Sequence, residues 1–145
     1  MAIRDVRNTD IYVLGSLMEQ LGYPIAVHDL AKNITHYSRL PHQRVWIAEH
    51  LGKVVGCVAV AITHYFHRPG SFLRVIALVV EQQHRRQGVG RELLQHAESF
   101  AREAGCTHVE LTSGVHRASI GTHAFYASQG FEELNDRKKY FVKKL

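Results

Sequence analysis

The sequence predicts an α/β (α+β) fold in a single domain over residues 1–145. We expect a mixed, mostly antiparallel sheet of about seven strands with helices on both faces. Apolar runs of strand length alternate with segments in which apolar residues recur every three or four positions, the spacing of an amphipathic helix. Gly and Pro residues separate these segments. The resulting order, β-αα-βββ-α-β-α-ββ, is typical of a sheet covered by helices.

The first half of the chain is expected to supply a strand, two helices and a hairpin. Residues 2–6 form the first strand, and the helix that follows it ends at Gly22. A second amphipathic helix begins after Asp29. Residues 45–50 and 53–63 form the hairpin, and because its second strand is apolar on both faces, we expect that strand at the centre of the sheet.

The second half continues this alternation. An almost continuous apolar strand at residues 72–80 leads into a long helix that starts after Gly90 and ends at Gly105, the residue type expected at a helix C-terminus. The remaining expected elements are a strand at 109–112, a helix at 118–128 and two closing strands at 130–134 and 139–142.

Composition favours an anionic partner and excludes several classes of protein. The formal net charge is +5 and the pI is about 9.4. Basic residues gather in the turn at 85–91 and near the C-terminus, and no helix carries a continuous basic stripe. A multiply charged cofactor fits this distribution better than nucleic acid. The longest apolar run, 54–62, is too short to span a bilayer, so we expect no membrane partner and a cytoplasmic location.

No metal site is expected. Cys57 lies inside an apolar run and Cys106 follows the end of a helix, so neither has the spacing of a zinc or redox motif. The nearest approach to a histidine cluster, His64 with His67, has a spacing that does not bring two imidazoles onto one ion at a strand end. Both thiols are therefore expected to be buried.

The segment at residues 78–94 carries the strongest functional signal, and it reads LVVEQQHRRQGVGRELL. An apolar strand runs into a basic turn and then a helix. Because Gly88 and Gly90 have no Cβ, backbone N–H groups can approach an anion closely, helped by the positive end of the helix dipole. Three arginines, Arg85, Arg86 and Arg91, add charge for phosphate oxygens. The sequence of this turn matches neither a P-loop nor the dinucleotide-binding motif, because Arg91 follows Gly90 and Leu93 stands where a third glycine would be required.

The pattern Arg85-x-x-Gly88-x-Gly90 resembles motif A of the GNAT superfamily, the acyl-CoA-dependent N-acetyltransferases, and in particular its small single-domain bacterial members. A second segment, AFYASQGF at residues 124–131, resembles the other recurrent GNAT signature, in which Phe-Tyr on a helix is followed by Gly-Phe. The two stand in the expected order, about 40 residues apart. The order of elements agrees with the GNAT fold over nearly the whole chain.

The resemblance implies acetyl-CoA as co-substrate and no metal. It implies that the backbone of the strand preceding the turn pairs with the pantetheine arm. The amides of the turn would then bind the pyrophosphate, with arginine side chains at its rim. Ser119 stands where many members carry an asparagine that contacts the cofactor. The cofactor-binding residues implied are Leu78, Val79, Val80, Arg85, Arg86, Gln87, Gly88, Val89, Gly90, Arg91 and Ser119.

The implied reaction is direct attack of a neutral amine on the acetyl thioester. Tyr126 is the candidate acid, since a phenol and a thiol have similar ordinary pKa values and the phenol can protonate the departing sulfur. Some members carry a glutamate on the fourth strand, but the corresponding residues 74–77 include no carboxylate. The general base is left open between Glu81, His84, His64 and a water chain.

The acceptor expected is a primary amine of a small molecule or an amino-acid-like compound. Two alternatives stay open: a protein Lys or N-terminal amine as acceptor, and a binding module that retains affinity for acyl-CoA without turnover. The acyl group is either acetyl or longer. The resemblance also implies a homodimer, for which the apolar stretch 140–142 offers a surface.

Overall fold

The structure, a computed structural model, describes residues 1–114, 117 and 121–145. These fall into two units, Met1–Leu111 and Thr112–Leu145, which are considered one at a time. The expectation of one domain over residues 1–145 stays a prediction.

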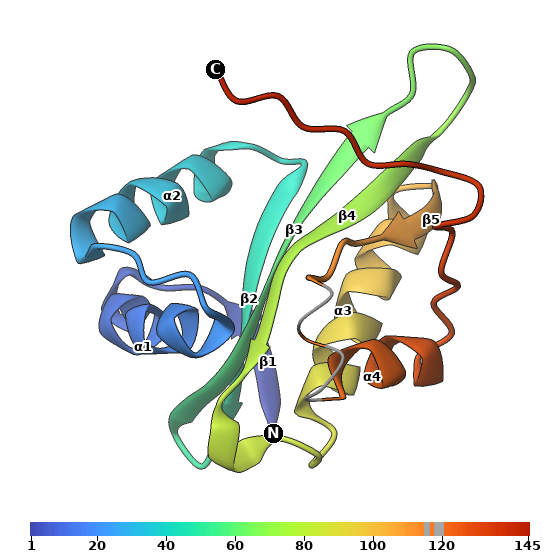
Figure 1. Cartoon of the computed structure of the whole chain (residues 1–145). Coiled ribbons are helices and arrows are strands. Elements are labelled where there is room, and N and C mark those ends of the chain that lie inside the picture. Colours follow the sequence, from blue (N-terminus) through green and yellow to red (C-terminus); the bar gives the residue numbers. More distant parts are fainter. Residues whose placement is uncertain (115–116, 118–120) are drawn as a thin grey trace. The chain divides into compact units, whose positions relative to one another are not determined.

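A five-stranded sheet forms the first unit (Figure 1), with strands β1 (Ala2–Asp5), β2 (Gln43–His50), β3 (Lys53–His64), β4 (Ser71–Val80) and β5 (Cys106–Glu110). The spatial order follows the sequence, β1-β2-β3-β4-β5. The first four strands pair antiparallel, and β5 pairs parallel to β4. The predicted mixed, mostly antiparallel sheet is confirmed, and the long apolar strand β3 lies at its centre.

Helices cover both faces of this sheet, as predicted. On one face, α1 (Ile11–Leu21) and α2 (Val27–Arg39) place Leu14, Leu17, Leu30 and Ile34 against Ile47, Cys57 and Val79 of the strands. On the other face lies α3 (Val89–Glu103), whose Phe100 ring meets the ring of Trp46 edge-on. Neighbouring residues of a strand point to opposite faces of the sheet. Because helices cover both faces, Trp46 and Ile47 are both buried although they point in opposite directions.

Among its described residues, the second unit contains the helix α4 (Thr122–Ser128), and the prediction of two closing strands is wrong. Residues 130–134 and 139–142 form no strand, so the part of the chain that the structure describes has five strands instead of about seven. The backbone N–H and C=O groups of a strand need a neighbouring strand as hydrogen-bond partner. A pattern of apolar and polar residues in the sequence does not show whether such a neighbour exists. Here the amides of Arg137 and Lys138 both donate to the Leu134 carbonyl and turn the chain. Among the described residues the other element boundaries shift by a few residues, as for β5, and the expected start of the helix at residues 118–120 lies outside the described residues.

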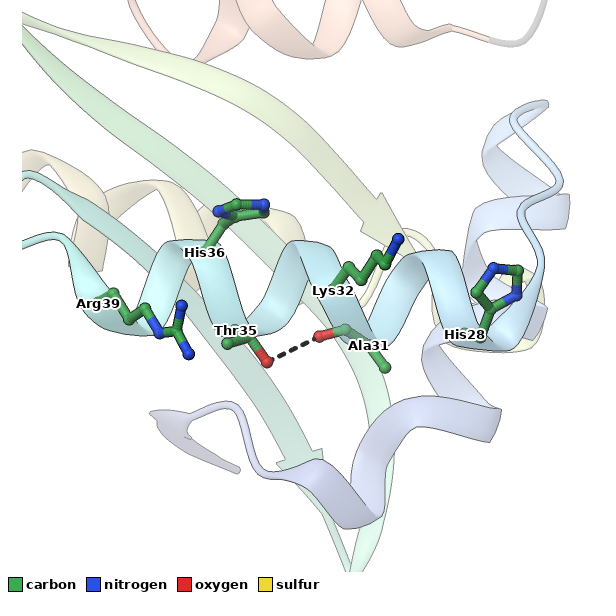
Figure 2. Close-up of a pocket in the computed structure, with 6 residues that line it drawn as sticks. All are labelled: His28, Ala31, Lys32, Thr35, His36 and Arg39. Carbon is green, nitrogen blue, oxygen red and sulfur yellow. Dashed lines mark hydrogen bonds between the residues drawn. The ribbon is translucent and has the colours of Figure 1, made fainter.

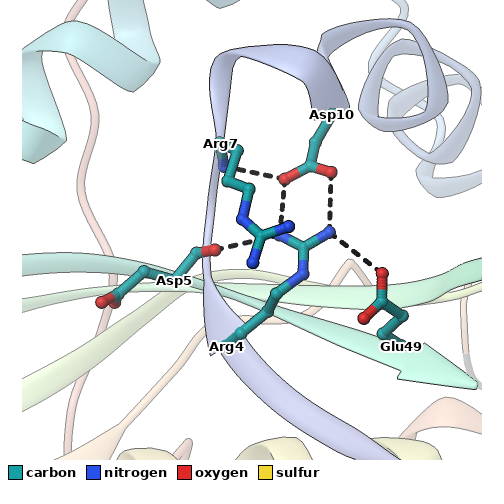
Figure 3. A network of polar contacts seen from close by, with 5 residues as sticks. All are labelled: Arg4, Asp5, Arg7, Asp10 and Glu49. Atoms are coloured by element: carbon teal, nitrogen blue, oxygen red, sulfur yellow. Dashed lines mark hydrogen bonds and ion pairs between the residues drawn. The ribbon is translucent and has the colours of Figure 1, made fainter. Parts of the chain in front are cut away.

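An ion-pair network fixes the start of the sheet to the loop that leads into α1 (Figure 3). The Arg4 guanidinium donates to both carboxylate oxygens of Asp10 at 2.9 Å and contacts Glu49 at 3.4 Å. The Arg7 amide donates to the same Asp10 carboxylate at 2.7 Å. Asp10 is buried, and the Arg4 hydrogen bonds hold its pKa below the ordinary value. Among the described helices, none combines the length and hydrophobicity needed to cross a bilayer.

Candidate active site

The side of β4 that faces β5 is paired along only part of its length. The β4–β5 pairing runs from Ser71 opposite Cys106 to Arg74 opposite Glu110, where β5 ends. From Val75 to Val80, no strand that the structure describes pairs with this side of β4. A β-bulge also interrupts the ladder with β3, leaving Ile76 without an opposite residue and half exposed. An open edge of sheet therefore extends from the bulge to the turn that follows β4.

Backbone groups of Leu78 and Val80 face this open edge. The Glu81 amide donates to the Val55 carbonyl of β3 at 2.8 Å. Because backbone groups alternate in direction along a strand, Val79 also faces β3, and its two neighbours face away from it. The Val79 side chain belongs to the core under α1 and α2. At the end of the strand, the Arg85 side chain donates from Nε to the Val80 carbonyl at 3.1 Å.

The turn between β4 and α3 adopts the backbone expected of an anion site. Arg86 has a φ of 62° and Gly88 has a φ of 85°, so two residues close together take the left-handed conformation. Gly88 precedes the first residue of α3, and its carbonyl accepts the Glu92 amide at 3.0 Å. Within the described part of the chain, the amides of residues 86–91 have no hydrogen-bond acceptor. The turn thus presents a row of unpaired donors at a helix N-terminus.

Close packing at Gly56 holds this helix end in place. A Cβ at Gly56 would lie 3.0 Å from the Val79 carbonyl oxygen, 3.1 Å from Val89 and 3.2 Å from Leu93. The absence of a side chain therefore lets the first turn of α3 rest directly on β3. Both Val89 and Leu93 are buried in this contact. The position of the row of amides is set by the core beneath it.

The structure separates the three residues considered as general base. Glu81 and His84 lie together in the turn, where the Glu81 carboxylate is 2.8 Å from the Nδ1 atom of His84. This hydrogen bond is the main cause that lowers the pKa of Glu81 below its ordinary value. His64 pairs with Ser71 at the opposite end of β4, and its ring meets the ring of His42. The length of β4 separates this histidine from the other two.

A polar cluster that the sequence analysis missed lies where β5 ends. Glu110 accepts from Arg74 at 3.1 Å through Oε1 and lies 3.1 Å from Nε2 of His108 through Oε2. Nδ1 of the same imidazole is 3.2 Å from the Tyr65 hydroxyl, and the imidazole stacks on Phe72 at 5.2 Å. The only sequence signal is the alternation His108-Val109-Glu110, which puts two polar side chains on one face of a strand. The expected strand at 109–112 left this histidine out.

Tyr126 lies on α4 in the second unit. The Phe131 amide donates to the Tyr126 carbonyl at 3.1 Å, and the two rings approach at 5.8 Å, so the Phe-Tyr and Gly-Phe pairs close the C-terminus of the helix. Burial raises the pKa of the Tyr126 phenol, and the charge of Arg117 opposes that rise. Ser119 lies outside the described residues.

An open depression on α2 involves none of the expected site residues (Figure 2). It is lined by His28, Ala31, Lys32, Thr35, His36 and Arg39, all side chains of this one helix. The Thr35 hydroxyl donates to the Ala31 carbonyl at 3.0 Å. Among the described residues, no three His, Cys, Asp or Glu side chains are arranged to hold a metal ion.

The chain matches a known protein family and several known proteins. The profile of the Acetyltransferase (GNAT) family matches residues 12–131, and the chain belongs to this family. It is similar to N-acetyltransferase family 8 member 2 of Rattus norvegicus, with 34% identity over 79% of this chain and 48% of that protein. It is also similar to the aminoalkylphosphonate N-acetyltransferase of Salmonella typhimurium, with 30% identity over 67% of this chain and 62% of that enzyme.

A third relative is the IAA acetyltransferase of Azospirillum brasilense, with 36% identity over 64% of this chain and 57% of that protein. The chain spans about half the length of the family 8 relatives.

Solved structures show the same fold at low identity. A GNAT family acetyltransferase of Staphylococcus aureus superposes with a TM-score of 0.79 at 22% identity, covering 99% of this chain and 98% of that one. An aminoglycoside 6′-N-acetyltransferase of Acinetobacter haemolyticus superposes with a TM-score of 0.82 at 19% identity, covering 100% and 99%. The GNAT fold expected from the sequence is confirmed.

Proposed function

We propose that the chain transfers the acetyl group of acetyl-CoA to a primary amine of a small molecule or amino-acid-like acceptor. One observation carries this proposal: the open edge of β4 runs directly into a turn whose amides have no acceptor in the described part of the chain. An edge strand can pair with an extended, amide-containing arm, and a row of amides at a helix N-terminus can bind phosphate. The pantetheine arm and the pyrophosphate of CoA have these two chemistries in this order.

In this proposal the residues of the open edge and of the turn have different roles in binding acetyl-CoA. Leu78 and Val80 would pair with the amides of the pantetheine arm, while Val79 would support the edge through its core side chain. Arg85 lies at the junction of edge and turn, because its Nε donates to the Val80 carbonyl. Its remaining N–H groups can reach a phosphate there. Arg86, Gln87, Gly88, Val89, Gly90 and Arg91 would bind the pyrophosphate, and Ser119 would contact the cofactor.

The reaction would proceed by direct attack. The amine nitrogen forms a bond to the thioester carbonyl carbon, and a backbone N–H of β4 stabilises the oxyanion. The C–S bond then breaks, and the sulfur takes a proton from the Tyr126 hydroxyl. Because burial raises the pKa of this phenol, it stays protonated through neutral and mildly basic pH.

A small-molecule acceptor is supported by the names of two relatives. One is named for aminoalkylphosphonates and another for IAA. We further propose a cytoplasmic protein that forms a homodimer through the exposed residues Tyr140, Phe141 and Val142. Light scattering on the purified chain would measure the mass in solution, and a monomer at micromolar concentration would contradict the dimer.

The proposal is tested by titrating the protein with acetyl-CoA in a calorimeter, next to the Gly88→Glu variant. No atom lies within 4 Å of a Cβ placed at Gly88, so the new side chain extends into the space where the pyrophosphate is expected. Its negative charge would also repel phosphate. We expect micromolar binding by the wild type and none by the variant.

Gly105→Glu is the matched control. Gly105 follows the other end of α3, has a φ of 77° and also has no atom within 4 Å of its Cβ position. Both variants therefore carry a similar backbone strain of about 1–2 kcal/mol. Equal loss of binding in both would contradict the assigned site, and no binding by the wild type would contradict the function. Acetyl-CoA binding without turnover of any amine would identify a binding module instead of an enzyme.

A further inference from the structure

We infer that the Glu110 carboxylate contacts the acceptor's amino group and takes its proton, and that His108 and Arg74 position this carboxylate. The inference rests on the proposed acetyl transfer and adds the general base that the sequence left open. Three observations support it. The open edge of β4 ends at Glu110, the Glu110 side chain lies on an accessible face of the sheet, and its hydrogen bonds leave lone pairs of the carboxylate available.

The open edge is closed at one end by Glu110. An arm that enters from the turn and pairs with Val80 and Leu78 runs toward Ile76. From Val80 to Ile76 there are four steps of about 3.3 Å each, a distance of about 13 Å. Two residues further along the strand, at Arg74, the edge meets Glu110, the last residue of β5. A group carried at the tip of the arm therefore arrives beside Glu110, whereas Glu81 and His84 lie at the end where the arm enters.

The cluster occupies an accessible face of the sheet. Arg74 is paired with Ala61 of β3, and Ala61 points to the same face as Cys57, the face covered by α1 and α2. Leu73 and Val75 point the other way and are buried. The side chains of Glu110 and His108 are 36% and 38% exposed. An acceptor can therefore reach the carboxylate from this face.

Hydrogen bonds fix the carboxylate and leave part of it open. A carboxylate accepts at about four lone-pair positions, and Arg74 and His108 use one on each oxygen. Because a carboxylate only accepts, Nε2 of His108 must carry the hydrogen. Nδ1 of the same ring lies 3.2 Å from the Tyr65 hydroxyl and 3.1 Å from the Thr107 hydroxyl. The Thr107 hydroxyl donates to the Ser71 carbonyl at 3.2 Å.

The proton balance of the step is complete. The amine lone pair attacks the thioester carbon, and as the C–N bond forms, a proton passes from nitrogen to a carboxylate oxygen of Glu110. The C–S bond breaks, and the sulfur receives the proton of Tyr126. Glu110 gives its proton to water, and the phenol is reprotonated from water. The net reaction converts an amine and acetyl-CoA into an amide and free CoA.

The test is steady-state kinetics of Glu110→Gln with acetyl-CoA and a panel of primary amines: 2-aminoethylphosphonate, an amino acid amide, a polyamine and a lysine peptide. Removal of a general base lowers the rate by typically about 10²- to 10⁴-fold. We expect kcat to fall about 100-fold or more. The acetyl-CoA Kd measured by calorimetry should change less than about twofold.

Two further variants keep the test specific. His108→Gln should lower kcat less than the loss of Glu110 does and leave the acetyl-CoA Kd unchanged, because it loosens the carboxylate without removing it. Glu98→Gln on α3 removes another paired carboxylate, 3.7 Å from Arg102, and should leave kcat unchanged.

Each outcome has a defined meaning. A wild-type kcat in Glu110→Gln would overturn the inference while the acetyl-CoA site stands. A wild type that binds acetyl-CoA but acetylates none of these amines would overturn it as well. A wild type that does not bind acetyl-CoA would overturn the proposed function, and the inference with it.

Discussion

Asp10 shows how much one buried carboxylate contributes to this fold. Arg4 binds both of its oxygens, and the Arg7 amide binds one of them. Removing one partner of a buried ion pair leaves the other charge uncompensated, which costs about 3–5 kcal/mol. We expect Asp10→Asn to lower the free energy of unfolding by about 3 kcal/mol at pH 7, measured by urea denaturation. Asp136→Asn, at an exposed position, should change it by less than about 0.5 kcal/mol.

The pH dependence of this effect has a definite sign. The pKa of Asp10 in the folded protein lies below its ordinary value of 3.8, chiefly because of Arg4. The stabilisation is therefore fully present above that ordinary value and is lost as the pH falls through the lower, folded-state value. The difference between wild type and Asp10→Asn should shrink below about pH 4. A difference that is the same at pH 3 and pH 7 would contradict the assignment.

At this scale the sequence predicted the turn but missed the cluster at Glu110. Gly88, Gly90 and the arginines are adjacent in sequence, and glycines before a helix have a local physical meaning. The position of the Glu110 carboxylate depends on its hydrogen bond with Arg74, which is 36 residues away in the sequence. The parallel pairing of β4 with β5 brings the two side chains together, and no local pattern contains that pairing.

At the scale of elements, the contact between α3 and β3 controls the position of the amide-lined turn. We expect Gly56→Ala to push the first turn of α3 away from β3, because the new methyl would lie 3.0 Å from the Val79 carbonyl oxygen. Overpacking of this kind costs about 1–3 kcal/mol. The variant should have a lower melting temperature and weaker binding of acetyl-CoA, measured by calorimetry.

Gly15→Ala in α1 is the control for this variant. A Cβ at Gly15 has no atom within 4 Å, and alanine stabilises a helix interior by about 0.5–1 kcal/mol relative to glycine. It should be neutral or slightly stabilising and leave acetyl-CoA binding unchanged. Unchanged stability and binding in Gly56→Ala would show that α3 adjusts without moving the turn.

Elements with a strong internal pattern were predicted well, and elements that depend on a distant partner were not. The strands β3 and β4 contain long apolar runs, so burial alone indicates them. The stretch 139–142 has strand-like residues flanked by lysines, yet it is exposed and unpaired among the described residues. Strand propensity describes how a residue fits a sheet that already exists.

For the whole molecule, the net charge of +5 predicts a salt-dependent affinity. The arginines of the turn are exposed, so their attraction to a polyanionic cofactor is screened over a Debye length of about 10 Å at 0.1 M salt. We expect the Kd for acetyl-CoA to rise several-fold between about 50 mM and about 500 mM KCl. Duplex DNA should show no comparable binding at either concentration. A Kd that is independent of salt would place the phosphates away from these arginines.

The unpaired side of β4 also bears on how the protein avoids aggregation. A bare sheet edge invites another chain to add a strand, which starts fibril-like association. Here an incoming strand would find only the short stretch from Val75 to Val80, which the bulge at Ile76 interrupts and beyond which β5 occupies the edge. Such a stretch is too short for stable pairing with a strand of another protein. It is long enough to pair with the unbranched pantetheine arm. The bulge therefore limits the pairing of other polypeptides with this edge, which we propose binds the pantetheine arm of acetyl-CoA.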